Sequence, residues 1–481
     1  MGVRWRFSGT IPSCGMRPGV SPVSSPRGMS PARKRIWAGS DTFSMTRPSD
    51  PLLLSPEGAR KQEVFFSAPR VPRRLERLIE EYIGRKTGKA WDDRVVLERI
   101  RAAVVAQKGQ YWARGRRREI SYEKGYNVFA YLAYHTPVYL VQTELLLHRL
   151  VTEGLLPRHL RVLDVGCGPG VVSAAVVDYF GRLEGATAEV TGLDRSEENL
   201  EAYAAIVRPY AGHKGVVSVR DPVMADLCNP PEDVLTGSFD LIVFSNVLNE
   251  LRGLGSEEKA DLVAGYARFL SPEGSILLAE PAEKETSTGL REVQRALVGS
   301  GMTVYAPCTY LWGAPCQPER CWTFESGPEI RPPRLMEALV AGKEGYRFRN
   351  TDIKVSYAVL RADGLTRWGD LERPAKSAHL GALSSHVGRQ VNLCAARMSG
   401  EIGDEKRHVV KICDGTTKKP VYAVLPEYAM NEENASLLTA EYGDLLFFAN
   451  VKVKYNKEVD TYSVIVGKKT TVTPLGRGND P

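Results

Sequence analysis

A glycine-rich turn after an apolar strand constrains the fold of this chain more than any other feature. Residues 161–170 read RVLDVGCGPG, and the aliphatic residues of this stretch suit a parallel strand that is buried on both faces. Gly166, Gly168 and Gly170 then allow the backbone to turn tightly beneath a ligand. The following VVSAAVVDYF is apolar enough for a helix packed on the sheet. A strand, a glycine turn and a helix N-terminus in this order predict a nucleotide-binding corner.

An acidic residue indicates which nucleotide this corner would bind. A dinucleotide fingerprint needs G-x-G-x-x-G, whereas the order here is D-x-G-x-G-x-G, with Asp164 ahead of the turn. That carboxylate would repel a phosphate and suits a cationic ligand. The pattern resembles the first motif of class I methyltransferases that use S-adenosylmethionine. The resemblance implies that Asp164, Gly166, Gly168 and Gly170 shape the pocket around the methionine end of the cofactor.

Further strands and acidic residues follow in the order that this fold requires. TAEVTGLDRS is a predicted strand that ends in Asp194, where a carboxylate can accept both ribose hydroxyls, and Asp226 lies near the expected position of the adenine. The fourth strand, FDLIVF, leads into Asn246, which we count among the cofactor-binding residues, and the fifth covers residues 274–282. Five strands with intervening helices predict an α/β class I (Rossmann-like) methyltransferase domain with a doubly wound sheet.

The motifs do not identify the methylated atom. Asn229-Pro230-Pro231 is similar to the N-P-P-Y motif of enzymes that methylate base amines, but it precedes the fourth strand instead of following it. We therefore interpret these prolines as a turn, and no catalytic residue is assigned.

Composition divides the rest of the chain into further segments. Residues 1–70 are rich in Pro, Gly, Ser and Arg, so we expect them to be disordered, and apolar residues at helical spacing predict a helical lead from residue 71. The predicted boundaries are a basic disordered segment at 1–70, a helical lead at 71–155, the methyltransferase-like domain at 156–362 with a cysteine-rich insertion at 306–324, a linker at 363–382 and a barrel at 383–476.

Positive charge is concentrated in the first quarter of the sequence. Residues 1–120 carry 25 Lys and Arg against 11 Asp and Glu, whereas the remaining residues have a net charge of −7. This asymmetry favours contact with a polyanion. Residues 1–40 hold seven basic and no acidic residues, so a mitochondrial presequence and a mis-assigned start, with Met29 or Met45 as the true one, both stay open.

The C-terminal part predicts a small β-barrel. Five short alternating strands follow residue 386, with a helical interval between the third and the fourth, and this order matches an OB-fold. Such barrels bind single-stranded nucleic acid through aromatic and basic side chains, while a barrel used only as a brace or protein contact is the alternative. The expected contributors are Tyr422, Tyr455, Tyr462, Lys452, Lys454 and Lys457.

Three cysteines lie close together in a loop that is rich in Pro and Gly. Cys308, Cys316 and Cys321 are separated by seven and four residues, a clustering that is typical of metal chemistry in a reducing compartment. Thiolates in a loop have the freedom to converge on one metal centre. Zinc and an iron–sulfur cluster both accept such ligands, so spacing alone does not identify the metal.

Here the sequence resembles the methyltransferase-like proteins of the ribosomal small subunit, which occur in mitochondria as an assembly factor and have bacterial and archaeal relatives. The resemblance covers residues 120–415 and depends on LDVGCGPG, SNVLNEL, AEPA and the cysteine segment. It implies an iron–sulfur cluster of the four-iron four-sulfur type, held by Cys308, Cys316, Cys321 and Cys413. Cys394 is the alternative fourth ligand, and zinc is the alternative metal.

The resulting hypothesis is an S-adenosylmethionine-dependent methyltransferase that acts on small-subunit ribosomal RNA or on the assembling subunit. We expect a monomer in the cytoplasm, associated with the ribosome, with a mitochondrial location as the alternative. No apolar run approaches the ~20 residues that span a bilayer, so we expect no membrane contact. A non-catalytic RNA-binding assembly factor and a methyltransferase for a small molecule or protein are the rival hypotheses.

Overall fold

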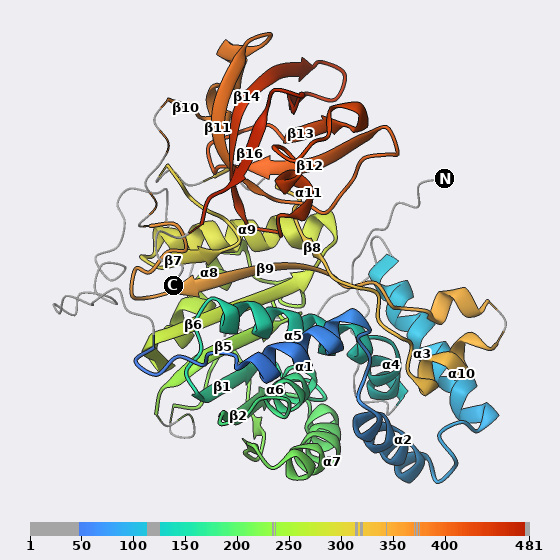
Figure 1. Cartoon of the computed structure of the whole chain (residues 1–481). Coiled ribbons are helices and arrows are strands. Elements are labelled where there is room, and N and C mark those ends of the chain that lie inside the picture. Colours follow the sequence, from blue (N-terminus) through green and yellow to red (C-terminus); the bar gives the residue numbers. More distant parts are fainter. Residues whose placement is uncertain are drawn as a thin grey trace, which may run out of the picture.

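The computed structural model comprises a methyltransferase-like sheet with helices on both faces and, above it, a β-barrel (Figure 1). The described residues are 48–112, 126–232, 237–312, 316–317, 321–342, 344–369 and 376–476, together with Leu235, Leu371 and Pro374. Of the basic segment expected at 1–70, residues 1–47, with the possible presequence, lie outside the described residues.

The large sheet has the strand order β3-β2-β1-β5-β6-β9-β7. Its first five strands are parallel, and β9 is antiparallel to both of its neighbours. This is the strand arrangement of class I methyltransferases, so the predicted fold class is confirmed. The strands are β1 (His159–Val165), β2 (Thr187–Asp194), β3 (Val217–Val219), β5 (Phe239–Ser245), β6 (Leu270–Pro281), β7 (Thr303–Ala306) and β9 (Lys354–Arg361), with β4 (Val223–Met224) paired to β2 and β8 (Glu325–Ser326) to β9.

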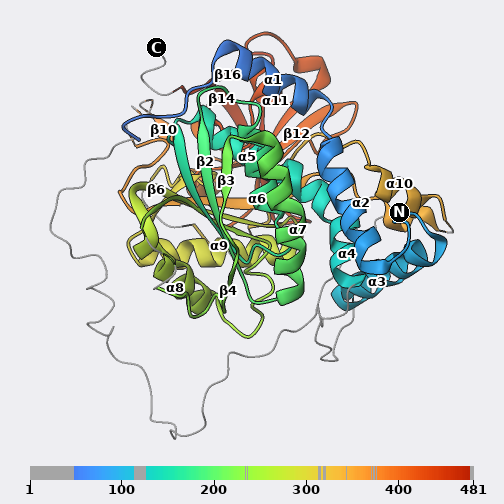
Figure 2. The ribbon, with the colours of Figure 1, turned by 90° about the horizontal axis from the view of Figure 1, so that it is seen from below.

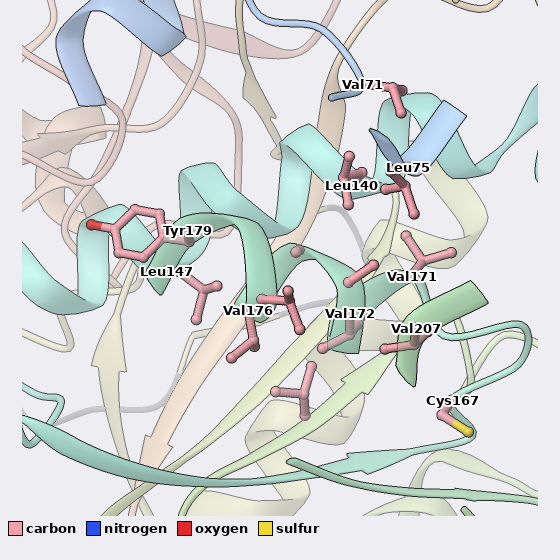
Figure 3. Packing of buried hydrophobic residues seen from close by; sticks show 14 of the residues in the cluster. Val71, Leu75, Leu140, Leu147, Cys167, Val171, Val172, Val176, Tyr179 and Val207 are labelled. Carbon is pink, nitrogen blue, oxygen red and sulfur yellow. The ribbon is translucent and has the colours of Figure 1, made fainter. Parts of the chain in front are cut away.

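Helices cover the two faces of this sheet because alternate strand residues point in opposite directions. Val162 and Val190 pack with α5, α6 and α7, whereas Leu163 packs with α8 and α9. Figure 3 shows part of the first of these cores, in which Leu140 of α5 and Val172 of α6 are buried. The helices are α5 (Thr136–Thr152), α6 (Val171–Phe180), α7 (Glu197–Lys214), α8 (Ser256–Tyr266) and α9 (Lys284–Gly299). The stretch after β5 forms turns up to Gly255.

The helical lead gathers at one end of the sheet (Figure 2). It consists of α2 (Arg73–Thr87), α3 (Arg94–Trp112) and α4 (Tyr126–Tyr134), and α10 (Arg334–Val340) packs against it. Pro137 lies in the first turn of α5, a position that tolerates proline because its backbone N–H would have no helical partner.

One expectation about the N-terminal region is wrong. Residues 56–67 were assigned to the disordered segment, yet Pro56–Ser67 forms helix α1. Ser55 caps this helix by accepting a hydrogen bond from Gly58 N at 3.0 Å. Gln62 is buried and accepts a hydrogen bond from Arg182 Nε at 3.0 Å. The cap and this long-range contact stabilise a helix that the local composition of Pro, Ser and Gly concealed.

The C-terminal domain is a closed five-stranded barrel. Its strands pair in the cycle β11-β12-β13-β15-β14-β11, and β13–β15 is the only parallel pair of the five. This is the OB-fold order, and α11 lies between the third and fourth strands as expected. The elements are β11 (Gln390–Arg397), β12 (Arg407–Cys413), β13 (Val421–Pro426), α11 (Ser436–Thr439), β14 (Leu445–Asn456) and β15 (Thr461–Ile465), with β10 (Ser377–Ala378) and β16 (Thr471–Pro474) at the edges.

Ion pairs connect the barrel to the methyltransferase domain. Arg149 of α5 contacts Glu325 of β8 at 2.5 Å and reaches Glu441 of the barrel at 3.1 Å. Arg367 joins Glu153 at 2.8 Å to Asp444 of the barrel at 3.1 Å. The two domains are therefore in direct contact. Among the described residues, no helix is both long enough and apolar enough to cross a membrane.

Candidate functional site

The glycine turn after β1 has the tight geometry that its sequence predicts. Gly166, Gly168 and Gly170 have φ values of 69°, 52° and 92°, in the region that disfavours other residues. A Cβ atom on Gly170 would lie 2.3 Å from Val207 Cγ2, and one on Gly166 would lie 2.7 Å from Val247 Cγ2. A Cβ atom on Gly168 would meet nothing within 4 Å. Gly166 and Gly170 therefore allow close packing, whereas Gly168 faces open space in which a ligand can approach.

Asp164 lies beneath this turn and is almost completely buried. Its Oδ2 accepts hydrogen bonds from the backbone N and the Oγ of Ser173, at 3.2 and 2.7 Å. Burial raises the pKa of Asp164 to about 7. The carboxyl group therefore fixes the start of α6 under the turn, a structural contribution that the sequence argument for a cationic ligand did not include.

Asp194 stands at the end of β2, opposite the glycine turn. Its Oδ2 accepts a hydrogen bond from Gly168 N at 2.9 Å, and its Oδ1 accepts one from Ser196 N at 2.8 Å. The pairing of Asp194 with Met224 brings β4, and the turn that contains Asp226, to the same edge of the sheet. Asp226 itself accepts a hydrogen bond from Cys228 N at 3.0 Å. The acidic residues predicted to contact the ribose and adenine thus follow neighbouring strands.

Asn246 follows β5 with a left-handed backbone, at φ 58°. Its backbone N donates to Ala279 O at 2.8 Å, and its Nδ2 donates to Ser245 Oγ at 3.2 Å. Its Oδ1 is buried and has no hydrogen-bond partner within the described chain. A strained residue with an unpaired buried oxygen is typical of a functional position.

Glu280, at the end of β6, is a site residue that the sequence argument missed. It is buried and accepts hydrogen bonds from Leu248 N at 2.8 Å, and from Asn249 N and Nδ2 at 3.2 and 2.7 Å. Burial raises its pKa to about 7. An isolated carboxylate at a strand end, in AEPA, was the available signal. Its contacts position the turn that follows Asn246.

Four of the predicted metal ligands line one cavity between the two domains. Cys308, Cys316 and Cys321 reach it from the segment after β7, and Cys413 reaches it from the end of β12. The cavity encloses about 690 Å³, part of it open to solvent. Cys394 does not line it and packs instead with Leu311 and Leu445. Among the described residues, no group of three or more His, Cys, Asp or Glu side chains is arranged so that it could hold a metal ion.

The segment that carries Cys321 is held by both domains. Thr323 Oγ1 donates to Met398 O of the barrel at 2.6 Å, and Thr323 O accepts from Ser356 Oγ of β9 at 3.1 Å. Lys411 Nζ of β12 donates to Trp322 O at 2.9 Å. The cavity wall therefore depends on contacts from the sheet and the barrel together.

The barrel residues expected to bind nucleic acid do not share one surface. Tyr422 pairs with Ser463, which pairs with Lys454, so these three residues point outward, away from the buried Val421. Tyr462 pairs with Val421 and with Tyr455, and the two tyrosine rings lie 5.0 Å apart on the other side of the strands. Lys452 is outward and exposed on the same face as Lys454, and Lys457 lies exposed just beyond β14. The outward face alone combines Tyr422 with lysines.

Comparisons with known proteins identify the central domain. Residues 156–322 match the family model described as "Methyltransferase domain", and residues 381–475 match "Domain of unknown function (DUF8157) C-terminal domain". No curated protein matches the chain. Neither family description names a ribosomal protein.

Solved structures with similar folds include two methyltransferases and a fibrillarin. Magnesium protoporphyrin IX methyltransferase from Synechocystis PCC 6803 is 14% identical, over 59% of this chain and 99% of that one, with a TM-score of 0.29. A methyltransferase from Thiobacillus denitrificans is 16% identical, over 46% and 90%, with a TM-score of 0.27. Fibrillarin from Aeropyrum pernix is 15% identical, over 41% and 66%, with a TM-score of 0.23. At these scores, the likenesses give no information on what this chain methylates.

Proposed function

We propose that the chain is an S-adenosylmethionine-dependent methyltransferase and that it methylates small-subunit ribosomal RNA or the assembling subunit. The observation that carries this proposal is the OB-fold barrel fixed directly to the methyltransferase domain. OB-fold barrels commonly bind single-stranded nucleic acid. The basic N-terminal quarter supports a polyanionic partner, and the choice of the ribosome rests on the sequence resemblance.

We assign cofactor roles to the residues at the carboxyl edge of the sheet. Gly166, Gly168 and Gly170 would lie along the methionine part of the cofactor, and Asp194 and Asp226 would lie toward its ribose and adenine. Asn246 would face the transferred methyl group with its unpaired Oδ1. The sulfonium of the cofactor supplies the leaving group, so the task of these residues is to align an in-line attack.

We further propose that the cavity between the domains holds an iron–sulfur cluster on Cys308, Cys316, Cys321 and Cys413. The residues fit such a group, because four thiols from two domains line one space. The choice of an iron–sulfur cluster over zinc rests on the sequence resemblance, because four thiolates suit either metal. When bound, the cluster would supply metal–thiolate bonds that join the barrel to the methyltransferase domain, so that its binding free energy also stabilises the fold.

Two measurements test these proposals separately. Purified protein incubated with labelled S-adenosylmethionine and immature small subunits should transfer label to RNA, and Asp194→Ala should not. Label in protein alone would favour a protein substrate, and no label with retained RNA binding would favour the non-catalytic assembly factor. Iron, sulfide and zinc assays on anaerobically purified protein test the cluster. Colourless protein that contains zinc would remove the iron assignment.

A further inference from the structure

Arg291, in the middle of α9, is completely buried without a carboxylate partner. Its Nη1 donates to Gln294 Oε1 at 2.7 Å and to Tyr357 O at 2.8 Å, and its Nη2 donates to Ser356 Oγ at 3.2 Å. All three acceptors are uncharged. Its Nε has no hydrogen-bond partner, and no acidic residue in the described chain forms an ion pair with it. A guanidinium in this position carries an uncompensated charge.

Three other arginines in the protein interior have carboxylate partners, whereas the buried Arg397 donates to backbone carbonyls. Arg361, which is also fully buried, pairs with Asp363. Arg182 pairs with Glu144 and Asp178, and Arg149 pairs with Glu325. Arginine is almost never fully buried unless it is paired, because removing its charge from water is costly. The environment of Arg291 therefore calls for an anion.

The contacts of Arg291 lead to the cysteine cavity. Gln294 Nε2 donates to Tyr310 Oη at 3.0 Å, and Ser356 Oγ donates to Thr323 O at 3.1 Å. Tyr310 and Thr323 both line the cavity. Burial acts to lower the pKa of Arg291, but the nearby Cys308 sulfur acts in the opposite direction, and the net shift is upward. The guanidinium thus lies directly behind the wall that faces the four thiols.

A metal–thiolate group in the cavity would supply the missing negative charge. A metal is bound by thiolates, and binding releases the thiol protons. Four thiolates on one zinc ion or one four-iron cluster leave the whole group negatively charged. A loaded site therefore gives Arg291 an anionic neighbour.

We propose that Arg291 is the buried counter-charge of an anionic metal–thiolate group in the cysteine cavity. This inference rests on the metal centre of the proposed function and adds the charge of the group and the residue that balances it. A disulfide or an uncharged apolar ligand in the cavity would carry no negative charge, so the charge of Arg291 would stay uncompensated. The arginine is a positioning residue, since it acts on the group through electrostatics and not as a ligand.

The test compares Arg291→Met with the wild-type full chain, loaded with metal and after anaerobic chelation. We expect the variant to bind metal about 10- to 100-fold more weakly, the range typical of removing a group outside the direct ligands. With metal bound, the urea midpoint of Arg291→Met should be lower than that of the wild type. Without metal, it should be equal to or higher than that of the wild type, because the variant lacks the unpaired buried charge. This change of sign is not expected of a residue that only packs. Arg291→Lys keeps the charge and should bind metal more tightly than Arg291→Met.

The outcomes separate the counter-charge from the metal centre itself. If wild-type protein holds no metal, the centre is refuted. If wild type loads, and Arg291→Met matches its metal affinity and both midpoints, the centre stands and the counter-charge is refuted. Should Arg291→Met fail to fold, Arg291→Gln replaces it in the same comparison with Arg291→Lys. If Arg291→Gln loses metal affinity and Arg291→Lys retains it, the counter-charge is supported. If the two variants bind metal with equal affinity, the counter-charge is contradicted.

Discussion

Two glycines of the same turn should respond in opposite ways to an added methyl group. In Gly170→Ala, the new Cβ would lie 2.3 Å from Val207 Cγ2 and 2.7 Å from Tyr203 Cδ2, at φ 92°. The left-handed backbone costs about 1–2 kcal/mol and overpacking about 1–3 kcal/mol, so the expected loss of unfolding free energy is about 2–5 kcal/mol. In Gly168→Ala, the new Cβ would meet nothing within 4 Å, so only the backbone cost applies.

Gly170→Ala should be the more damaging change for stability, whereas Gly168→Ala should be the more damaging change for cofactor binding. The space beside Gly168 is where we expect the methionine part of S-adenosylmethionine, and a methyl group there would collide with it. We expect a loss of affinity of at least about tenfold, which corresponds to 1.4 kcal/mol, with most of the stability retained. Urea denaturation measures the first quantity and calorimetric titration with S-adenosylmethionine the second.

A third variant checks the physical reason. In Gly170→Ala with Val207→Ala, the closest collision is removed, so the double variant should be more stable than the sum of the single losses predicts. Wild-type affinity in Gly168→Ala would refute the placement of the cofactor beside this glycine. Strict additivity of Gly170→Ala and Val207→Ala would refute the packing argument.

Three further predictions concern the other sites. Cys413→Ser should lower the metal content per chain measured by elemental analysis, whereas Cys394→Ser, outside the cavity, should leave it unchanged. Arg149→Met should destabilise the protein by about 3–5 kcal/mol in urea, because it leaves the buried Glu325 unpaired, while the exposed partner Glu441 changed to Gln should cost less than about 1 kcal/mol. Burial raises the pKa of Glu280 from 4.5 to about 7, so the folded state holds this proton more tightly than the unfolded chain, and stability should fall as the pH rises through that window. Glu280→Gln should flatten this part of the profile, and an unchanged slope would assign it to other groups, of which Asp164 is the first to examine.

The parts of the fold that the sequence predicted are those specified by local patterns. The sheet order follows from strands and helices that alternate along the chain, and the barrel follows from short strands with a helix after the third. That Cys308, Cys316 and Cys321 lie together was predictable because they cluster in the sequence, whereas Cys413 was added by the family resemblance. Helix α1 was missed because its stability comes from a distant partner, Arg182, and a local reading of composition does not contain that contact.

Side-chain environments at the sites were less predictable. Nothing in LREVQ marks Arg291 as a buried charge, since an arginine on an amphipathic helix ordinarily faces water. Tyr422 and Tyr455 were expected on one surface, but the two strands present them on opposite faces, and this depends on a register that the sequence does not give. Asn246 was placed at the correct strand end, while its unpaired oxygen became evident only in three dimensions.

The position of the cysteine cavity argues that a bound cluster does not take part in methyl transfer. The segment with Cys308 follows β7, whose carboxyl end lies at the same edge of the sheet as the glycine turn after β1. The two strands are separated by four strand spacings, or about 19 Å. Chemistry at the sulfonium requires atoms in near contact, so the cluster can influence transfer only by fixing the barrel. Protein loaded with zinc in place of iron should therefore retain RNA methylation as long as the zinc holds the same four cysteines, and loss of methylation with an intact domain contact would contradict this argument.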